Sequence, residues 1–383
     1  MELPTAEHPL RVLLVASPLT CRVARQMLQN SPDIQVCGTA QHGREALLLL
    51  PTLRPHVICL ADEMPVMSAL ELTREIMSRY ACPILVLQSS CGLEIPDAIS
   101  KESVFALLQA GAVDVFRMAS IVPSPDSPQT RQLISKVKMV SRVPVISRSQ
   151  RAYARSESEG SVGAAHTLES SAHRPAPRTI SLPTKTRSQN LESATSSRIV
   201  AIGASTGGPQ ALLAVLSELP RDYAVPVLCV QHISKGFIGG LVEWLDDQCQ
   251  IKIRIAQAGE KPQPGTVYFS EEGKHLELDE ADGTIRLSLS PAVDGHRPSV
   301  TVLFQSVARY SGNRAIAVLL TGMGCDGAQG LKAIHEAQGT TIAQNQESSV
   351  VFGMPAAAIG LGAAQHVLPL TSIASKIVAL SKF

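Results

Sequence analysis

The sequence is poor in aromatic residues, in net charge and in long apolar runs, and each shortage argues against a class of protein. Aromatic residues make up 3% of the 383 residues, and the formal net charge is +1. Proteins that bind nucleic acids usually need a basic surface and aromatic platforms. No run approaches the roughly 18 apolar residues that span a bilayer, and residues 1–9 lack the features of a secretory signal. We expect a cytoplasmic protein without a nucleic-acid partner or membrane insertion.

Cysteine pairs with metal-binding spacing are also missing. The eight cysteines include no C-x-x-C pair, and Cys59 and Cys229 lie inside apolar runs. Structural zinc sites need closely spaced ligands, whereas buried free cysteines are common in cytosolic cores. We therefore expect reduced, mostly buried thiols, no metal site and no cofactor.

Short apolar segments alternate with amphipathic ones over the first 140 residues, which we call the front domain (10–140). This alternation predicts five β-α units and hence a doubly wound parallel sheet. The predicted strands are 10–16, 34–38, 57–61, 84–87 and 113–116, and the predicted helices are 19–30, 43–50, 70–79, 104–110 and 130–139.

The composition changes at residues 141–197. Residues 147–197 hold 12 serines in 51 residues and almost no apolar stretch. Such a segment cannot bury enough apolar surface to offset its chain entropy, so we predict a flexible linker.

A globular pattern returns at residues 198–383, which we call the rear domain. It predicts a second doubly wound α/β domain with a short antiparallel hairpin at 267–289. The predicted strands are 199–203, 226–231, 253–256, 266–269, 285–289, 316–321, 340–343 and 366–368, and the predicted helices are 210–219, 238–248, 299–310, 328–338 and 355–359.

Ser205 lies in a Gly-rich turn between a predicted strand and a predicted helix, in the sequence AIGASTGGP. Such a turn lifts a hydroxyl clear of the sheet and surrounds it with backbone N–H groups, as an acyl-transfer nucleophile requires. The G-x-S-x-G pattern alone is weak evidence, because a glycine turn after a strand also suits a phosphate.

His232 and Asp326 follow two other predicted strands. Because the carboxyl ends of parallel strands meet at one edge, the three side chains are expected to converge there as a Ser-His-Asp triad. Taken singly, His232 could be structural and Asp326 could cap the helix that begins near residue 328. The alternative order Ser…Asp…His would need His335 or His366, which occupy a predicted helix and strand rather than a turn.

Several longer motifs carry a resemblance to a known family. Residues 198–383 resemble the catalytic domain of the chemotaxis protein-glutamate methylesterase (CheB) family. The matching segments are AIGASTGGP at 201–209, VQH at 230–232, GTVYF at 265–269, GHRPSV at 295–300, LLTGMG-x-DGA at 319–328 and SVVFGMPAAA at 349–358.

The resemblance implies hydrolysis of glutamate methyl esters on the cytoplasmic helices of methyl-accepting chemoreceptors, with release of methanol, and deamidation of receptor glutamines. Ser205, His232 and Asp326 would form the triad. The backbone N–H groups of Thr206 and Met323 are the oxyanion candidates, and His296 and Arg297 are expected to line the cleft. A catalytically silent scaffold, or a methylesterase for a partner outside chemotaxis, remain alternatives.

Three positions depart from the usual family pattern: Thr301 replaces an acid, Asp294 an asparagine, and Asn345 a position that is often acidic. We expect none of the three to touch the triad, so they bear on substrate choice.

The front domain resembles a response-regulator receiver domain in its framework. The matching segments are RVLLV at 11–15, RPHVICL at 54–60, EMPVM at 63–67 and AGAVDV at 110–115. Its phosphorylation residues are missing: Ala16 and Ser17 replace the acids that hold Mg²⁺, Ala61 the phosphoacceptor, Gln88 the hydroxyl and Met118 the lysine.

Without an acid in this pocket, Mg²⁺ has no carboxylate ligand. Asp62 is adjacent to Ala61, but neighbouring strand residues point to opposite faces. We therefore expect a pseudo-receiver with no phosphoacceptor, with Asp62 as a displaced acceptor the alternative. Its role is open: it could cover the esterase cleft until an unknown protein docks on it, lie undocked, or tether the esterase near its receptors.

Overall fold

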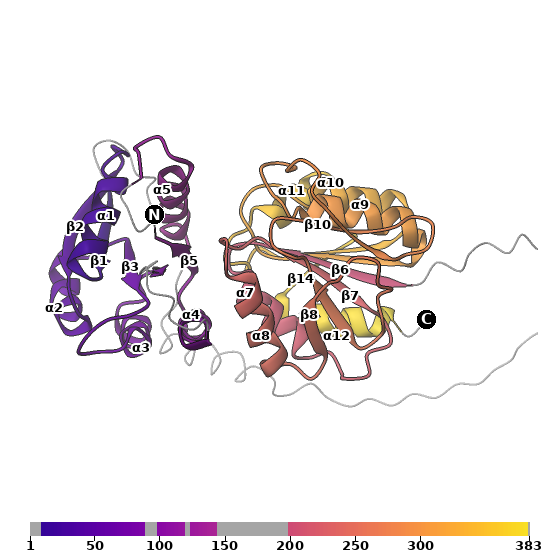
Figure 1. The fold of residues 1–383 in the computed structure, drawn as a ribbon, viewed down its shortest axis with the longest axis horizontal. Helices are drawn as coiled ribbons and strands as arrows, with labels where there is room; N and C mark the ends of the chain where they lie inside the picture. The colour runs from indigo at the N-terminus through magenta and orange to yellow at the C-terminus, as the bar shows by residue number, and fades with distance from the viewer. Residues whose placement is uncertain (1–8, 89–97, 119–122, 144–197, 382–383) are drawn as a thin grey trace, which may run out of the picture. The chain divides into compact units, whose positions relative to one another are not determined.

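The structure is a computed structural model that describes residues 9–88, 98–118, 123–143 and 198–381, with the side chains of 98–103 excepted. Within these ranges the chain folds around two parallel β-sheets, each flanked by helices (Figure 1). The described residues of both sheets belong to one compact unit. The predicted linker at 141–197 falls almost entirely outside the described residues, so the domain boundaries stay a prediction.

The front sheet has five strands in the order β2-β1-β3-β4-β5, and all neighbouring strands run parallel. The strands are β1 (Leu10–Val15), β2 (Ile34–Ala40), β3 (Val57–Ala61), β4 (Ile84–Gln88) and β5 (Asp114–Arg117). The helices are α1 (Pro18–Leu28), α2 (Gly43–Leu53), α3 (Ala69–Arg79), α4 (Ala98–Ala110) and α5 (Pro128–Val140).

Alternate residues of the front strands enter two separate cores. Leu13 and Val15 of β1 pack in the cluster that includes residues of α2, α3 and α4. Val12 and Leu14 pack in the other cluster, with residues of α1 and α5. Because strand side chains alternate between faces, helices cover both faces of the sheet, as a doubly wound fold requires.

The rear sheet has seven parallel strands in the order β14-β13-β12-β6-β7-β9-β8. The strands are β6 (Ile199–Ala204), β7 (Val227–Gln231), β8 (Lys252–Ile255), β9 (Thr266–Phe269), β12 (Ala315–Leu319), β13 (Thr340–Gln344) and β14 (His366–Leu368). The antiparallel pair β10 (His275–Leu278) and β11 (Ile285–Ser288) lies outside this sheet.

Helices cover both faces of the rear sheet (Figure 1). One face carries α7 (Gly208–Leu216), α8 (Ile238–Gln248) and α12 (Leu370–Leu380). The other carries α9 (Val300–Ser311), α10 (Ala328–Glu336) and α11 (Met354–Gly360), with the short helix η1 (Gly312–Arg314) following α9.

The predicted fold class is confirmed, and the differences are local. Strand β10 and helix α12 were not predicted, and β9 belongs to the parallel sheet rather than to the hairpin. No helix among the described residues is long and apolar enough to cross a bilayer. The seven described cysteines are free, and four of them are buried, whereas Cys325 is exposed and Cys91 lies outside the described residues.

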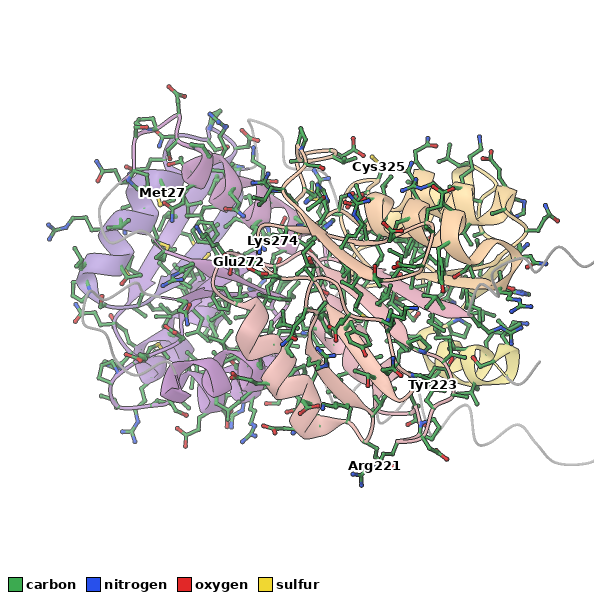
Figure 2. The ribbon with its side chains drawn as sticks, turned by 45° about the vertical axis from the view of Figure 1, so that its right-hand side comes forward. Met27, Arg221, Tyr223, Glu272, Lys274 and Cys325 are labelled. Atoms are coloured by element: carbon green, nitrogen blue, oxygen red, sulfur yellow. The ribbon has the colours of Figure 1, made fainter. Side chains whose placement is uncertain are left out.

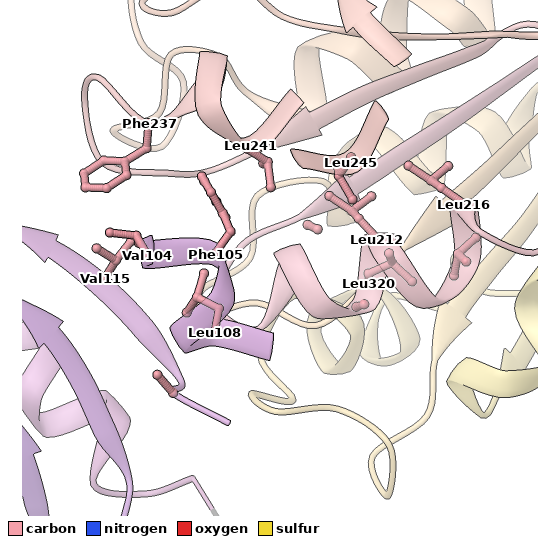
Figure 3. Packing of buried hydrophobic residues seen from close by; sticks show 14 of the residues in the cluster. Val104, Phe105, Leu108, Val115, Leu212, Leu216, Phe237, Leu241, Leu245 and Leu320 are labelled. Carbon is pink, nitrogen blue, oxygen red and sulfur yellow. The ribbon is translucent and has the colours of Figure 1, made fainter. Parts of the chain in front are cut away.

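Apolar residues of α4 pack against helices of the rear domain (Figure 3). Phe105 is buried, and its ring stacks on Trp244 of α8 with centroids 5.5 Å apart and an interplanar angle of 18°. The side-chain amide of Gln210 in α7 also donates to the carbonyl oxygens of Leu108 and Ala112. Within this unit the front domain is therefore docked on the rear domain through α4.

Candidate active site

Ser205 and His232 directly follow two neighbouring central strands of the rear sheet. Ala204 of β6 lies opposite Gln231 of β7, and the N–H of His232 donates to the carbonyl of Ala204 at 2.9 Å. The N–H of Ser205 donates to the carbonyl of Thr321, which follows β12, at 3.0 Å. The fold thus brings three turns together at the carboxyl edge of β12, β6 and β7.

The turn after Ser205 favours glycine at two positions. Gly207 has φ +75°, the left-handed region that other residues rarely adopt. A Cβ atom at Gly208 would lie 1.9 Å from Oε1 of Gln231. These two glycines let α7 start immediately behind Ser205, so that its hydroxyl is carried at the strand-to-helix junction.

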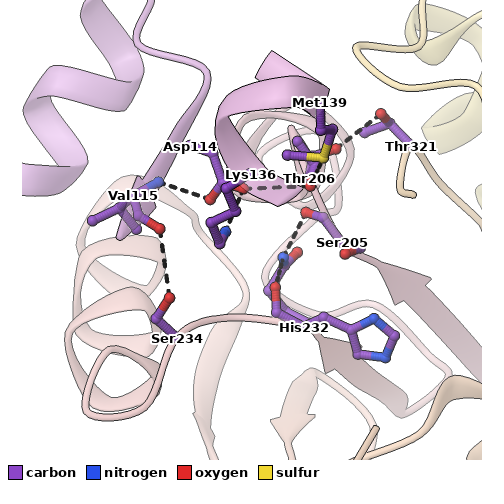
Figure 4. A network of polar contacts seen from close by, with 10 residues as sticks. Asp114, Val115, Lys136, Met139, Ser205, Thr206, His232, Ser234 and Thr321 are labelled. Atoms are coloured by element: carbon purple, nitrogen blue, oxygen red, sulfur yellow. Dashed lines mark hydrogen bonds and ion pairs between the residues drawn. The ribbon is translucent and has the colours of Figure 1, made fainter. Parts of the chain in front are cut away.

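Gln231 joins the two turns, a role that the sequence reasoning missed. Its side-chain NH₂ donates to the carbonyl of Ser205 at 2.7 Å and to that of His232 at 2.8 Å (Figure 4). The side chain is buried, so these bonds replace lost contacts with water. The available signal was a polar residue at the end of an otherwise apolar strand.

The carboxylate of Asp326 lies 2.8 Å from Nε2 of His232. Both side chains are shielded, with 1% of Asp326 and 8% of His232 exposed. The approach is close but not aligned: among the described residues, neither ring nitrogen of His232 has a partner with hydrogen-bond geometry. Asp326 and His232 are therefore brought together, while the Ser205 hydroxyl is not bonded to the ring in this state.

The N-terminus of α9 holds the Asp326 carboxylate. It accepts hydrogen bonds from the Ser299 hydroxyl at 2.8 Å and from the N–H groups of Val300 and Thr301 at 2.8 and 3.0 Å. Burial alone would raise the pKa of Asp326, but the neighbouring His232 and these donors outweigh it and keep the pKa well below its usual value. The group is therefore a permanent carboxylate at neutral pH.

One alternative and one expectation from the sequence were wrong in this region. Asp326 does not cap the helix that follows it, since α10 begins after Gly327 without a side-chain cap, and the carboxylate caps α9 instead. Thr301 does contact Asp326: its N–H donates to the Asp326 carboxylate, and its hydroxyl accepts from the N–H of Gly327 at 2.8 Å. The helix N-terminus is a ready anion site whatever the side chain at 301.

Thr206 and Met323, the oxyanion candidates, lie in the segments that follow β6 and β12. The carbonyl of Thr206 accepts from the Thr321 hydroxyl at 3.0 Å, which ties the first turn to the end of β12. Among the described residues, the N–H groups of Thr206 and Met323 donate to no carbonyl. Both are available as donors to a substrate oxygen.

His296 and Arg297 line a cleft of about 640 Å³ together with His232. Lys235 and Glu272 line it too, and Figure 2 marks Glu272 on the rear domain. Arg297 donates to the carbonyls of Leu289 and Ser290, so it braces the loop that carries His296. The cleft offers both signs of charge next to the imidazole.

Residues of the front domain reach the turn that follows Ser205. The hydroxyl of Thr206 lies 3.1 Å from Sδ of Met139 and 3.4 Å from the carboxylate of Asp114, which pairs with Lys136 at 2.5 Å (Figure 4). The Ser234 hydroxyl, two residues after His232, lies 3.5 Å from the carbonyl of Val115. Front-domain residues therefore contact the turns next to both Ser205 and His232.

The ends of β1 and β3 in the front sheet carry no acid at residues 16, 17 and 61. Ala16 and Ala61 are buried apolar residues at the ends of β1 and β3, and the Ser17 hydroxyl caps α1 by accepting from Thr20. Asp62 is mostly buried, and its N–H donates to the carbonyl of Leu87.

The two alternative histidines lie away from Ser205. His335 is in the last turn of α10, and His366 begins β14. Strand β14 is separated from β6 by β13 and β12 in the sheet. Neither His335 nor His366 therefore directly follows a strand next to β6, as His232 does.

Comparison with known proteins supports a single family. Residues 200–377 match the family model described as CheB methylesterase. A relative from Syntrophus aciditrophicus, named protein-glutamate methylesterase/protein-glutamine glutaminase 1, is 37% identical over 97% of this chain and 98% of its own length. A relative of the same enzyme name from Nitrosospira multiformis is 37% identical over 97% of both chains.

Two solved structures from Thermotoga maritima are each similar to part of this chain. The CheB methylesterase catalytic domain of Thermotoga maritima is 37% identical and covers 48% of this chain and 99% of its own, with a TM-score of 0.47. The response regulator domain of CheB from the same organism is 27% identical and covers 35% of this chain and 98% of its own, with a TM-score of 0.28. Because the identity to full-length relatives extends over both halves, this chain belongs to the CheB methylesterase family.

Proposed function

We propose that this chain hydrolyses glutamate methyl esters, and deamidates glutamines, on the cytoplasmic helices of methyl-accepting chemoreceptors. The observation that carries the proposal is the Asp326 carboxylate 2.8 Å from His232, at the strand edge that also presents Ser205. The names of the relatives supply the reaction class. Absence of a membrane-spanning helix among the described residues fits an enzyme that meets its receptor from the cytoplasm.

The proposed reaction is acyl transfer through Ser205. Its hydroxyl oxygen attacks the ester carbonyl carbon while His232 takes the hydroxyl proton, and the carbonyl oxygen becomes an oxyanion. The N–H groups of Thr206 and Met323 would stabilise this oxyanion. The C–O bond to the methoxy group then breaks, and methanol leaves with the proton from His232.

A water molecule completes the cycle. His232 takes a proton from the water, whose oxygen attacks the acyl–serine ester, and Ser205 leaves with that proton. With a glutamine substrate the leaving group is ammonia instead of methanol, so one site serves both reactions. Asp326 stays ionised throughout and stabilises the imidazolium.

We further propose that receiver phosphorylation does not control this enzyme. No carboxylate is present at Ala16, Ser17 or Ala61 to bind Mg²⁺ or to accept a phosphoryl group. The Ser17 hydroxyl caps α1. The docked α4 surface supports a role in which the front domain restricts the esterase until a partner protein displaces it. Undocked and purely tethering roles are the alternatives.

The deciding experiment measures release of labelled methanol from receptors methylated with a labelled methyl group. We expect release by the wild-type chain and a fall of at least about three orders of magnitude for Ser205→Ala. Reactivity with a serine-directed phosphonate without methanol release would favour a partner outside chemotaxis. Absence of both would favour a catalytically silent scaffold and contradict the proposal.

A further inference from the structure

The imidazole rings of His232 and His296 are stacked face to face. Their centroids are 3.8 Å apart and the planes differ by 2°. The two residues come from separate segments, one directly after β7 and one from the loop before α9. A parallel stack this tight places the His296 ring against one face of the His232 ring.

The backbone around His296 is firmly held. Its N–H donates to the carbonyl of Val293 at 2.9 Å, and its carbonyl accepts from the N–H of Val293 at 3.1 Å. The turn between them consists of Asp294, with φ +50°, and Gly295, with φ +80°. The next residue, Arg297, donates to two carbonyls of the preceding loop. The His296 ring therefore rests on a rigid support rather than on a free loop.

The same segment fixes the partner of His232. Three residues after His296, the Ser299 hydroxyl bonds the Asp326 carboxylate, and the N–H groups of Val300 and Thr301 do so as well. One stretch of chain, 293–301, thus sets both the carboxylate at one edge of the His232 ring and the plane of that ring.

A carboxylate at one nitrogen does not by itself fix the ring plane. Neither nitrogen of His232 has an aligned hydrogen bond among the described residues, so the contact with Asp326 leaves rotation of the ring open. A flat surface at 3.8 Å removes this freedom. Proton transfer from a serine depends on that plane, and small errors of orientation cost rate.

The charge state of His296 suits this role. Burial first, and the neighbouring His232 second, lower the pKa of His296, while the carboxylates of Asp326 and Asp294 oppose the shift. A neutral ring can stack on an imidazole that takes up a proton, whereas a second imidazolium at this distance would repel it.

We propose that His296 is a positioning residue that holds the plane of the His232 ring by stacking. This inference rests on the proposed function, because it assigns His296 a part in the proton transfer made by His232. It predicts that a flat ring without nitrogen would serve at position 296, and that a small side chain would not.

The test compares the full-length wild type with His296→Ala, His296→Phe and the control His366→Ala, which alters a histidine on β14. In methanol release we expect His296→Ala to lower kcat about tenfold or more with KM within about twofold, and His296→Phe to stay within about threefold of the wild type. His366→Ala should leave both parameters unchanged. Thermal unfolding of each variant identifies any loss of rate that comes from loss of fold.

Two results would overturn the proposal. An unchanged kcat in His296→Ala would show that the stack is dispensable. If kcat fell as much in His296→Phe as in His296→Ala, a ring nitrogen of His296 would act directly, on the substrate or through its charge.

A readout that needs no activity separates this proposal from the proposed function. In NMR spectra of the ¹³C-labelled histidine side chains, stacking predicts a ring-current shift of the His232 signals that disappears in His296→Ala and persists in His296→Phe. Wild-type protein that shows this shift but releases no methanol would refute the proposed function and leave the stack intact. Absence of the shift in active wild type would refute the stack.

Discussion

Asp326 and His232 lie 2.8 Å apart in the rear domain, although 94 positions of sequence and three strands of the rear sheet, β8, β9 and β12, separate them along the chain. The carboxylate is further bonded to the N-terminus of α9. This pair is the part of the site with the clearest physical consequences, because a buried charge is tolerated only where its partners are fixed.

Substitution of Asp326 should change the response to acid. Its pKa is lowered in the folded protein, so its contribution to stability is present above the unfolded-state pKa, about 3.9, and is lost as the pH falls through the lower folded-state value. We expect Asp326→Asn to be less stable than wild type at pH 7 by on the order of 2–4 kcal/mol, with the difference shrinking below about pH 4. Urea unfolding followed by the fluorescence of Trp244, the single tryptophan, measures this. A difference that is constant down to pH 2 would contradict it.

Substitution of Gln231 should reduce turnover without abolishing binding. Gln231→Leu removes the two donations that tie the Ser205 turn to the His232 turn. We expect kcat to fall about tenfold or more with little change in KM, because loosened geometry affects the chemical step first. Gln257→Leu, at an exposed position, is the control. Wild-type turnover in Gln231→Leu would show that strand pairing alone positions the turns.

Treatment with a small phosphodonor and Mg²⁺ should not modify the front domain. The pocket lacks carboxylates at positions 16, 17 and 61, and Asp62 directly follows β3 beside that pocket. Mass spectrometry after incubation with acetyl phosphate is expected to detect no added phosphoryl group. The Asp62→Asn variant gives the background level of phosphoryl incorporation. Incorporation that occurs in the wild type and is lost in this variant would identify Asp62 as a displaced acceptor.

Loss of the Phe105 ring should release the esterase if the docked state limits it. Phe105→Ala removes the stack on Trp244 and leaves a cavity, at a typical cost of about 3–5 kcal/mol. We expect the initial rate of methanol release to rise severalfold and the Trp244 fluorescence to change. Leu48→Ala, exposed on the same domain, should do neither. If both variants released methanol at the same rate, and circular dichroism showed that the front domain was still folded, this contact would not restrict the esterase.

Much of the fold was predictable because its strands are buried on both faces. β6 and β7 are uninterrupted apolar runs that end in polar turns, and that pattern located Ser205 and His232 as well as the strands. β10 escaped prediction because its sequence HLEL is short and mixed. Helix α12, LTSIASKIVAL, is absent from the predicted elements, although its apolar residues pack on the rear sheet.

The support around the site was less predictable than the site itself. Gln231, His296 and Ser299 act across segments that only the folded sheet brings together. Thr301 illustrates the difficulty: its side chain is visible in the sequence, but its backbone contact with Asp326 is not. Sequence patterns describe side chains, whereas two of the groups that hold Asp326 are backbone N–H groups.

That reliance on backbone has a consequence for how the site tolerates change. The amide groups of Val300 and Thr301 that hold Asp326 exist in every residue except proline, so single replacements at 300 and 301 can alter packing without removing the positive end of α9. The charge of Asp326 can therefore stay balanced while the side chains around it change.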